Sequence, residues 1–312
     1  MQDVADAAAS TSYTDCDSVG APDRLMRKAE TVLSSRTDRI LLVLERCTDN
    51  QNYLACLRTA EILGVQNVWI VLSPRGMKND CLLAAADGGA ADDAGGGGGG
   101  FVDKGELSKK RGRIARCSSQ WLDIRTFATT GECVSALLAD GREIWATDLA
   151  QATQSALLLD GTGVELPPRL AIVMGREADG VSQEMLAAAH KRVCLPMYGF
   201  NDSFNLSVAT SMVLHHLFIC CPQARGDLPP ERKRALRIEW YSRLARTDAQ
   251  RAEFLARVDD PPPPFVDVRR PDAHRTCWVP PKIARKEQEQ AASLSEERQA
   301  LRDGSEGQQR ED

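Results

Sequence analysis

Short continuous apolar runs, each followed by a helical pattern, are the feature of this chain that most restricts its fold. Such runs occur at Ile40–Leu44, Asn67–Leu72 and Arg169–Met174. A strand that is apolar on both faces is typical of a parallel sheet covered by helices on both sides. Because strand and helix patterns alternate along the chain, the sequence predicts an α/β fold built on a parallel sheet.

Composition divides the chain into an ordered centre and polar ends. Residues 1–20 are small, polar and acidic, and residues 247–312 are Pro-rich and then charged. We predict that both are largely disordered tails. One domain is expected over residues 21–246, interrupted at residues 74–112 by a flexible insertion. This insertion contains six consecutive glycines, which lack the spacing of a phosphate-binding loop.

The cysteines and the hydropathy narrow the class of protein. The chain has ten cysteines without a CxxC pair, and no Cys/His spacing typical of a metal site. We therefore expect free thiols, no bound metal and a reducing intracellular compartment, with the cytoplasm as the simplest case and an organelle left open. No apolar run approaches the ~18 residues of a membrane span, so no membrane partner is expected.

Charge is distributed unevenly. The net charge of −5 does not favour nucleic-acid binding. Basic residues nevertheless gather in Lys104–Arg116, Arg232–Arg246 and Arg269–Lys286. Local basic clusters can bind phosphate groups despite an acidic total, whereas an ordinary solvated surface is the alternative for each cluster.

The stretch Val193–Leu217 holds a short strand pattern, a turn and a helical pattern. Asp202 and Ser203 are residue types that cap helix N-termini, so we predict a helix from Phe204 onwards. That helix is apolar on more than one face, which is typical of a buried helix. Polar residues crowd its first turns, where free N–H groups can bind a ligand. Capping with core packing, and ligand binding, are both open interpretations at this point.

Residues 195–209, LPMYGFNDSFNLSVA, resemble the third motif of SPOUT-superfamily RNA 2′-O-ribose methyltransferases of the TrmH type. Asn52–Ala60 is similar to the first motif of that family and Gly175–Ser182 to the second. The resemblance extends from about Pro22 to Arg246. It implies a SPOUT-type α/β fold, in which a parallel sheet ends in a C-terminal trefoil knot and is flanked by N- and C-terminal helices.

The resemblance also implies S-adenosylmethionine as the methyl donor, bound by the loops of the knot. The residues that correspond to the cofactor pocket are Thr147, Gly175, Leu195, Met197 and Phe204. The residues that correspond to the catalytic site are Arg58, Asn52, Glu177, Ser203 and Asn205. In this arrangement Arg58 stabilises the developing alkoxide of the ribose. The two asparagines and the serine orient the reacting groups, and Glu177 holds them by hydrogen bonds.

Family members act as dimers, so the resemblance implies a homodimer through the helix at residues 204–217, with Arg58 of one chain meeting the cofactor of the other. Ser118–Thr147 is similar to the TrmH branch, which favours tRNA, with a D-loop guanosine as the target. Two alternatives stay open. One is the same reaction on rRNA, and the other is a non-catalytic RNA-binding protein with this fold.

Overall fold

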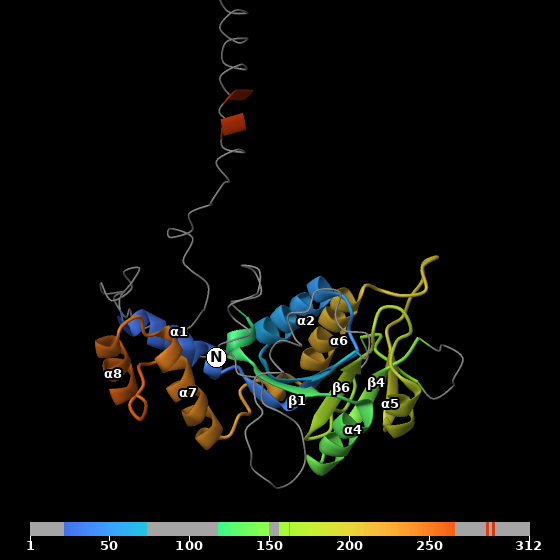
Figure 1. Cartoon of the computed structure of the whole chain (residues 1–312), viewed down its shortest axis with the longest axis horizontal. Helices are drawn as coiled ribbons and strands as arrows, with labels where there is room; N and C mark the ends of the chain where they lie inside the picture. The colour runs from blue at the N-terminus through green and yellow to red at the C-terminus, as the bar shows by residue number, and fades with distance from the viewer. Residues whose placement is uncertain are drawn as a thin grey trace, which may run out of the picture. The chain divides into compact units, whose positions relative to one another are not determined.

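Seven strands form one sheet in the order β3-β2-β1-β6-β4-β7-β5 in this computed structural model, and each neighbouring pair is parallel (Figure 1). The strands are β1 (Thr37–Glu45), β2 (Val65–Val71), β3 (Asp123–Phe127), β4 (Glu143–Thr147), β5 (Leu157–Leu158), β6 (Leu170–Met174) and β7 (Lys191–Cys194). The predicted parallel α/β sheet is therefore confirmed.

The structure describes residues 22–73, 118–149, 156–161, 163–265, 285–286 and 289–290. The predictions for residues 1–20 and for the insertion at 74–112 lie outside these described residues. The chain divides into one unit up to Val266 and a second from Asp267. In the second unit, an ion pair of 2.9 Å between Arg285 and Glu289 is described.

Helices cover both faces of the sheet. α2 (Asn50–Leu63) and α6 (Leu206–Cys220) cover one face, and α4 (Thr130–Ala139) and α5 (Gln183–Ala188) cover the other. The remaining described helices are α1 (Pro22–Leu33), α7 (Pro230–Leu244) and α8 (Asp248–Ala256), with 3₁₀ turns η3 (Ser119–Trp121) and η4 (Pro222–Ala224). Among these helices, none has the length and apolarity needed to cross a bilayer.

The alternation of side chains along β1 explains why helices are needed on both faces. Ile40 and Leu42 pack into a core that includes residues of α2 and α6. Leu41 and Val43 point the other way, into a core shared with α4 and α5. Successive side chains of a strand point to opposite faces, so an uninterrupted apolar run requires a covering layer on each side.

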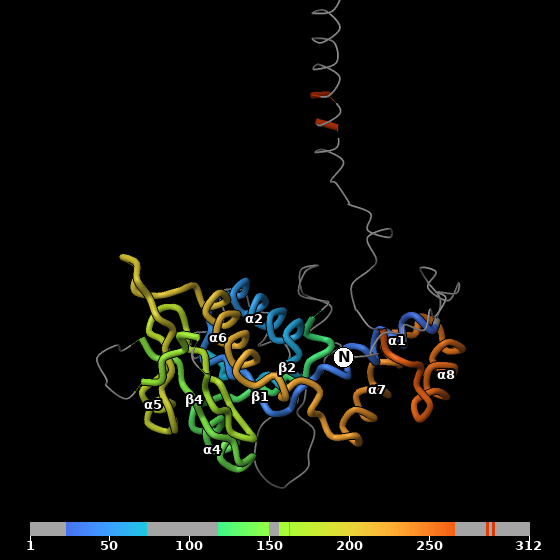
Figure 2. Tube along the Cα trace, turned by 180° about the vertical axis from the view of Figure 1, so that it is seen from behind, coloured from blue at the N-terminus to red at the C-terminus, as the bar shows by residue number. Residues whose placement is uncertain are grey.

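A third core joins α1, α7 and α8, which lie together beside the sheet (Figure 2). Met26, Trp240 and Phe254 are buried there. α8 was not predicted, because it lies within residues 247–312, whose composition is that of a tail. Its local signals are Thr247, whose side chain accepts from the Gln250 N–H, and the buried Phe254.

The start of α6 differs from the prediction. The helix begins at Leu206, two residues after Phe204, and its N-cap is Asn205. The Asn205 Oδ1 accepts hydrogen bonds from the Ser207 N–H at 2.9 Å and from the Ser207 hydroxyl at 2.7 Å. Asp202 and Ser203 have suitable side chains for a cap, but they lie too far from the first helical turn to serve.

Candidate active site

Three of the predicted cofactor residues lie side by side at one edge of the sheet. Thr147 ends β4, Gly175 follows β6 and Leu195 follows β7. β4 pairs with both β6 and β7, and all three strands are parallel, so their carboxyl ends meet at the same edge. The Thr147 hydroxyl donates to the Val173 carbonyl at 2.9 Å, which fixes the β4 end against β6. In open α/β sheets, ligands bind outside this edge of the strands.

Gly175 begins a tight turn directly after β6. A Cβ placed on Gly175 would lie 2.1 Å from the Gly180 carbonyl carbon. Arg176 and Gly180 exchange two backbone hydrogen bonds of 3.1 and 2.9 Å, which close the turn. Gly180 has a φ of 68°, a conformation that favours glycine. Both glycines are therefore required by the geometry of the turn that carries Glu177.

A chain of side-chain hydrogen bonds connects three of the predicted catalytic residues. The Asn52 Nδ2 donates to the Glu177 Oε1 at 2.9 Å. The Asn205 Nδ2 donates to the Asn52 Oδ1 at 3.0 Å. These residues come from the first turn of α2, from the turn after β6 and from the N-cap of α6. The fold thus brings together one residue from each of the three sequence motifs.

The remaining predicted residues of the third motif lie apart from this hydrogen-bond chain. Ser203 is exposed and forms no hydrogen bond with it in the part of the chain described. Met197 is half-buried, and Phe204 is 39% exposed. The segment between β7 and α6 runs outward from the sheet, yellow in Figure 1, and exposes Tyr198 and Phe200 almost completely.

Arg58 is not brought to the Asn52–Glu177 pair within one chain. It lies six residues after Asn52 on α2. Six residues of α-helix correspond to a rise of about 9 Å and a turn of about 240°, so the two side chains leave the helix on different faces. Arg58 is exposed, and no ion pair or hydrogen bond joins it to another described residue.

α6 has an inner face and an outer face, in contrast to the expectation of burial nearly all round. Leu206, Val213, Leu214 and Leu217 are buried on the inner face. Val208, Met212 and Ile219 are exposed on the outer face. Ile62 on the neighbouring α2, which packs against α6 through a Thr59–Ser211 hydrogen bond of 3.1 Å, is also exposed.

The basic residues of α7 are paired with partners inside the protein. Arg232 forms an ion pair with Asp123. Arg234 and Arg237 form ion pairs of 2.6 and 2.7 Å with Asp259 and Glu30. Lys233 and Arg243 also bond to neighbours, through the Gly226 carbonyl, Glu239 and the Gln120 carbonyl. These contacts hold α7 against the rest of the chain, a role that differs from both phosphate binding and an ordinary solvated surface.

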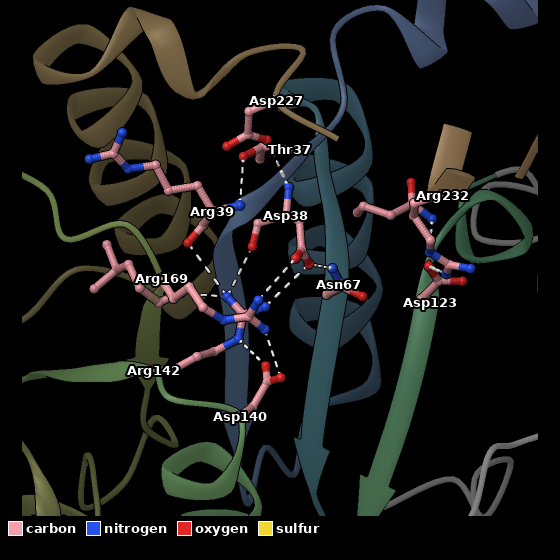
Figure 3. A network of polar contacts seen from close by, with 12 residues as sticks. Thr37, Asp38, Arg39, Asn67, Asp123, Asp140, Arg142, Arg169, Asp227 and Arg232 are labelled. Carbon is pink, nitrogen blue, oxygen red and sulfur yellow. Dashed lines mark hydrogen bonds and ion pairs between the residues drawn. The ribbon is translucent and has the colours of Figure 1, made fainter. Parts of the chain in front are cut away.

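A second polar cluster lies at the opposite edge, where the strands begin. Figure 3 shows the Arg142 guanidinium between Asp38 and Asp140, and the ion pairs measure 3.2 and 2.7 Å. Arg142 also donates to the Asp38 and Leu170 carbonyls at 3.0 and 3.3 Å. The cluster lines a cavity of about 200 Å³. Because Arg142 is almost completely satisfied, it serves to tie the starts of β1, β4 and β6 together.

The cluster lowers the pKa of the Asp140 carboxyl. Burial of its carboxyl opposes ionisation, but hydrogen bonds from Arg169 and Arg142 outweigh burial and hold its pKa below the ordinary value. Elsewhere, no group of three or more His, Cys, Asp or Glu side chains in the described ranges is placed to hold a metal ion.

Comparison with known proteins finds relatives among RNA methyltransferases. The profile of the SpoU rRNA Methylase family matches residues 101–215. A relative named tRNA (guanosine(18)-2′-O)-methyltransferase from Borreliella burgdorferi is 26% identical over 72% of this chain and 87% of its own length. These likenesses support the assignment of the chain to the SPOUT superfamily, in its TrmH type.

Two further TrmH-type proteins show the same likeness. The tRNA (guanosine(18)-2′-O)-methyltransferase of Escherichia coli K12 is 27% identical over 62% of this chain and 69% of its own length. The crystal structure of the Aquifex aeolicus TrmH/SpoU tRNA modifying enzyme superposes with a TM-score of 0.52 at 21% identity, covering 72% of this chain and 99% of that one. The structural likeness supports the SPOUT fold of the sheet and its flanking helices.

Proposed function

We propose that this TrmH-type protein methylates the 2′-hydroxyl of a ribose in tRNA, at a guanosine of the D-loop, with S-adenosylmethionine as methyl donor. The observation that carries the proposal is the hydrogen-bonded chain Glu177–Asn52–Asn205 beside the carboxyl ends of β4, β6 and β7. The names of the relatives support tRNA and guanosine as the substrate. The family profile, named for rRNA, keeps the same reaction on rRNA as the second candidate.

The edge formed by Thr147, Gly175 and Leu195 fits the cofactor. Backbone groups at the ends of parallel strands can bind the adenine and ribose, and Gly175 allows close approach to the backbone. Leu195 is half-buried against the core and offers an apolar contact. Met197 and Phe204 are assigned to the same pocket. They lie on the segment that runs outward, so their part in it requires that segment to fold over the bound cofactor.

S-adenosylmethionine supplies an electrophilic methyl group on a sulfonium. The protein's task is to hold the ribose oxygen in line with that methyl group and to keep water away, since positioning gives most of the acceleration in such a transfer. A guanidinium stays cationic near neutral pH. We therefore assign Arg58 to stabilising the alkoxide as the 2′-hydroxyl proton leaves to a substrate phosphate or water.

The orientation of the ribose is assigned to the amide groups of the site. Asn52 is held by Glu177 on one side and Asn205 on the other. Its side chain is therefore pre-oriented before substrate arrives, which lowers the entropy lost in the transition state. Ser203 is assigned to the same task. It is exposed in the free chain and would join the site with Met197 and Phe204.

A homodimer completes the site in this proposal, because one chain separates Arg58 from Asn52. Val208, Met212 and Ile219 give α6 an exposed apolar face next to α2, the helix that carries Arg58. Contiguous exposed apolar residues mark interaction sites. Packing of two α6 helices against each other would place Arg58 of one chain at the cofactor edge of the other. The C-terminal trefoil knot of the family is also proposed for this chain. The cytoplasm is proposed as its compartment, in line with the free thiols described.

The test is transfer of labelled methyl from S-adenosylmethionine to an unmodified tRNA transcript, followed by mapping of the 2′-O-methyl position. A matched transcript with 2′-deoxyguanosine at the mapped position should accept no label. Label in an rRNA fragment but not in tRNA would replace the first candidate by the second. RNA binding without S-adenosylmethionine binding or methyl transfer would show the non-catalytic alternative.

A further inference from the structure

Consecutive residues at the end of β1 contact successive positions of the turn that carries Glu177. Glu45 is fully buried. Its Oε2 accepts from the Ser182 N–H at 2.8 Å, and its Oε1 accepts from the Ser182 hydroxyl at 2.5 Å and the Thr130 hydroxyl at 2.7 Å. Glu45 was not among the predicted site residues. The sequence signal for it is a carboxylate directly after the apolar run of β1.

Arg46 holds the middle of the turn. Its φ is 54°, which makes it the one non-glycine residue with a positive φ among those described. Its N–H donates to the Val71 carbonyl at 2.9 Å. Its guanidinium lies 3.8 Å from the Asp179 carboxylate, which also accepts two hydrogen bonds from Arg176 within the turn. The backbone of a non-glycine residue is strained at a positive φ, and such strain persists only where the surrounding contacts impose it.

Cys47 completes the contact at the other end of the turn. Its thiol is buried and lies 3.7 Å from the Glu177 Oε1 and 3.4 Å from the Asp49 carbonyl. Burial, with the nearby Glu177 charge, raises the pKa of this thiol far above its ordinary value. The thiol therefore stays protonated, and it can donate either to the Asp49 carbonyl or to the Glu177 carboxylate, which also accepts from Asn52.

We propose that Glu45 and Arg46 are positioning residues for methyl transfer. They hold the turn at residues 176–182 against the end of β1, so that the Glu177 carboxylate keeps Asn52 oriented. This inference rests on the proposed function. It assigns a reason to the strained conformation of Arg46, whose side chain is held over the turn at the expense of an unfavourable backbone.

Substitution of Arg46 by glycine separates positioning from folding. Glycine adopts a positive φ without strain, so Arg46→Gly should leave Tm unchanged or raised while removing the contact to Asp179. We expect kcat to fall roughly tenfold, with KM for S-adenosylmethionine changed less than about threefold, because loss of orientation acts in the transition state. Arg46→Asn, which also tolerates this conformation, should behave alike. Arg251→Ala, a control at an exposed ion pair of α8, should keep full kcat.

Glu45 is tested by a graded pair. Glu45→Gln retains the shape and an acceptor for the Ser182 N–H, whereas Glu45→Ala removes both. Recovery of at least half of the lost kcat in the glutamine variant relative to the alanine variant supports a positioning role. Unchanged kcat in Arg46→Gly, or a fall in kcat that only follows a fall in Tm across these variants, would overturn the proposal.

Amide hydrogen exchange keeps this test independent of the proposed function. The Ser182 and Gly180 amides donate to Glu45 and to the Arg176 carbonyl. In Arg46→Gly both should exchange roughly tenfold faster than in the unchanged protein, since their protection reports local opening of the turn. Equal exchange rates would contradict the positioning role. If the unchanged protein transfers no methyl to any RNA, the proposed function fails, and the exchange rates alone still decide whether Glu45 and Arg46 hold the turn.

Discussion

Asn52 and Glu177 lie 125 positions apart in the sequence and share a hydrogen bond of 2.9 Å between Nδ2 and Oε1. The carboxylate accepts from one side of the amide, and the Asn205 amide donates to the other side. The amide plane of Asn52 is therefore fixed from both ends. These two partners decide which atom of the Asn52 amide is the nitrogen and which is the oxygen, because the two atoms look alike.

Substitution of Asn52 by alanine should lower kcat by about 10- to 100-fold without a comparable loss of S-adenosylmethionine affinity. The reason is that the Asn52 amide orients the ribose that accepts the methyl group. Its loss therefore acts on the transition state more than on cofactor binding. Steady-state methyl transfer to tRNA measures the change. The neighbouring exposed Gln51 provides a control in the same helical turn, and Gln51→Ala should retain normal kcat. An Asn52→Ala variant with normal kcat would contradict the assigned role.

Complementation between two inactive chains should reveal whether Arg58 acts across a dimer. Arg58→Ala and Asn205→Ala homodimers should each be inactive. Co-expression of the two variants yields some heterodimers, and in each heterodimer one of the two sites carries neither substitution. We expect the mixture to recover about a quarter of the normal activity, because random pairing makes about half the dimers mixed, each with one intact site. A mixture that forms dimers but stays inactive would exclude the shared site.

Substitution of Gly175 by alanine should destabilise the protein by at least about 1–3 kcal/mol, the usual range for overpacking. The added Cβ would meet backbone atoms of Gly180 and Val181 at 2.1 and 2.2 Å, which cannot move aside like a flexible side chain. Urea unfolding gives the free energy. Gly163 has open space around its Cβ position, so Gly163→Ala is the matched control and should unfold at nearly the same urea concentration as the unchanged protein.

Removal of the Glu30 carboxylate should destabilise the core of α1, α7 and α8. Glu30 accepts two bonds of 2.7 Å from Arg237 and one of 2.9 Å from the Tyr241 hydroxyl. In Glu30→Ala these donors lose their acceptor inside a buried core, which costs about 3–5 kcal/mol. Chemical denaturation followed by tryptophan fluorescence measures this loss in the free energy of unfolding, since Trp240 is buried in the same core. Arg251→Ala, at an exposed pair, should change the free energy by less than about 0.5 kcal/mol.

Protonation of Asp140 in acid should lower the stability of the folded protein. Its pKa in the folded protein lies below the ordinary value. The carboxylate therefore contributes stability that is complete above the unfolded pKa of about 3.9 and is lost as pH falls through the lower folded pKa. Tm measured from pH 6 down to pH 2.5 should show this decline, and Asp140→Asn should reduce its slope. Asp260→Asn, at an exposed carboxylate, should leave the slope as it is.

The strands could be predicted because their apolar runs are continuous, as in Ile40–Leu44 and Arg169–Met174. The helix cap could not, because Asp202, Ser203 and Asn205 are all capping types and only the three-dimensional path of the chain selects Asn205. The pairing of the α7 arginines was equally hidden. A basic cluster in sequence looks the same whether its partners are Asp123 and Glu30 or the phosphates of an RNA.

The separation of Arg58 from Asn52 shows a further limit of pattern reasoning. Both residues belong to one motif, but a helix of 3.6 residues per turn places positions six apart on different faces. The motif therefore identifies the right residue types without showing that a single chain assembles them. Glu45 and Arg46 are the opposite case, because contacts across 137 and 133 positions to Ser182 and Asp179 give them a role that no local pattern indicates.

The position of β6 in the sheet has a consequence for biosynthesis. β6 pairs with β1 on one side and β4 on the other, although both precede it in the chain. Until Met174 has left the ribosome, the inner edge of β1 has no partner and β4 has no neighbour in the sheet. Unpaired apolar strand edges are prone to aggregate, and pairings of such long sequence separation form slowly. A nascent chain that pauses before Leu170 therefore exposes the unpaired edge of β1, with its apolar run Ile40–Leu44, and is prone to aggregate at that stage.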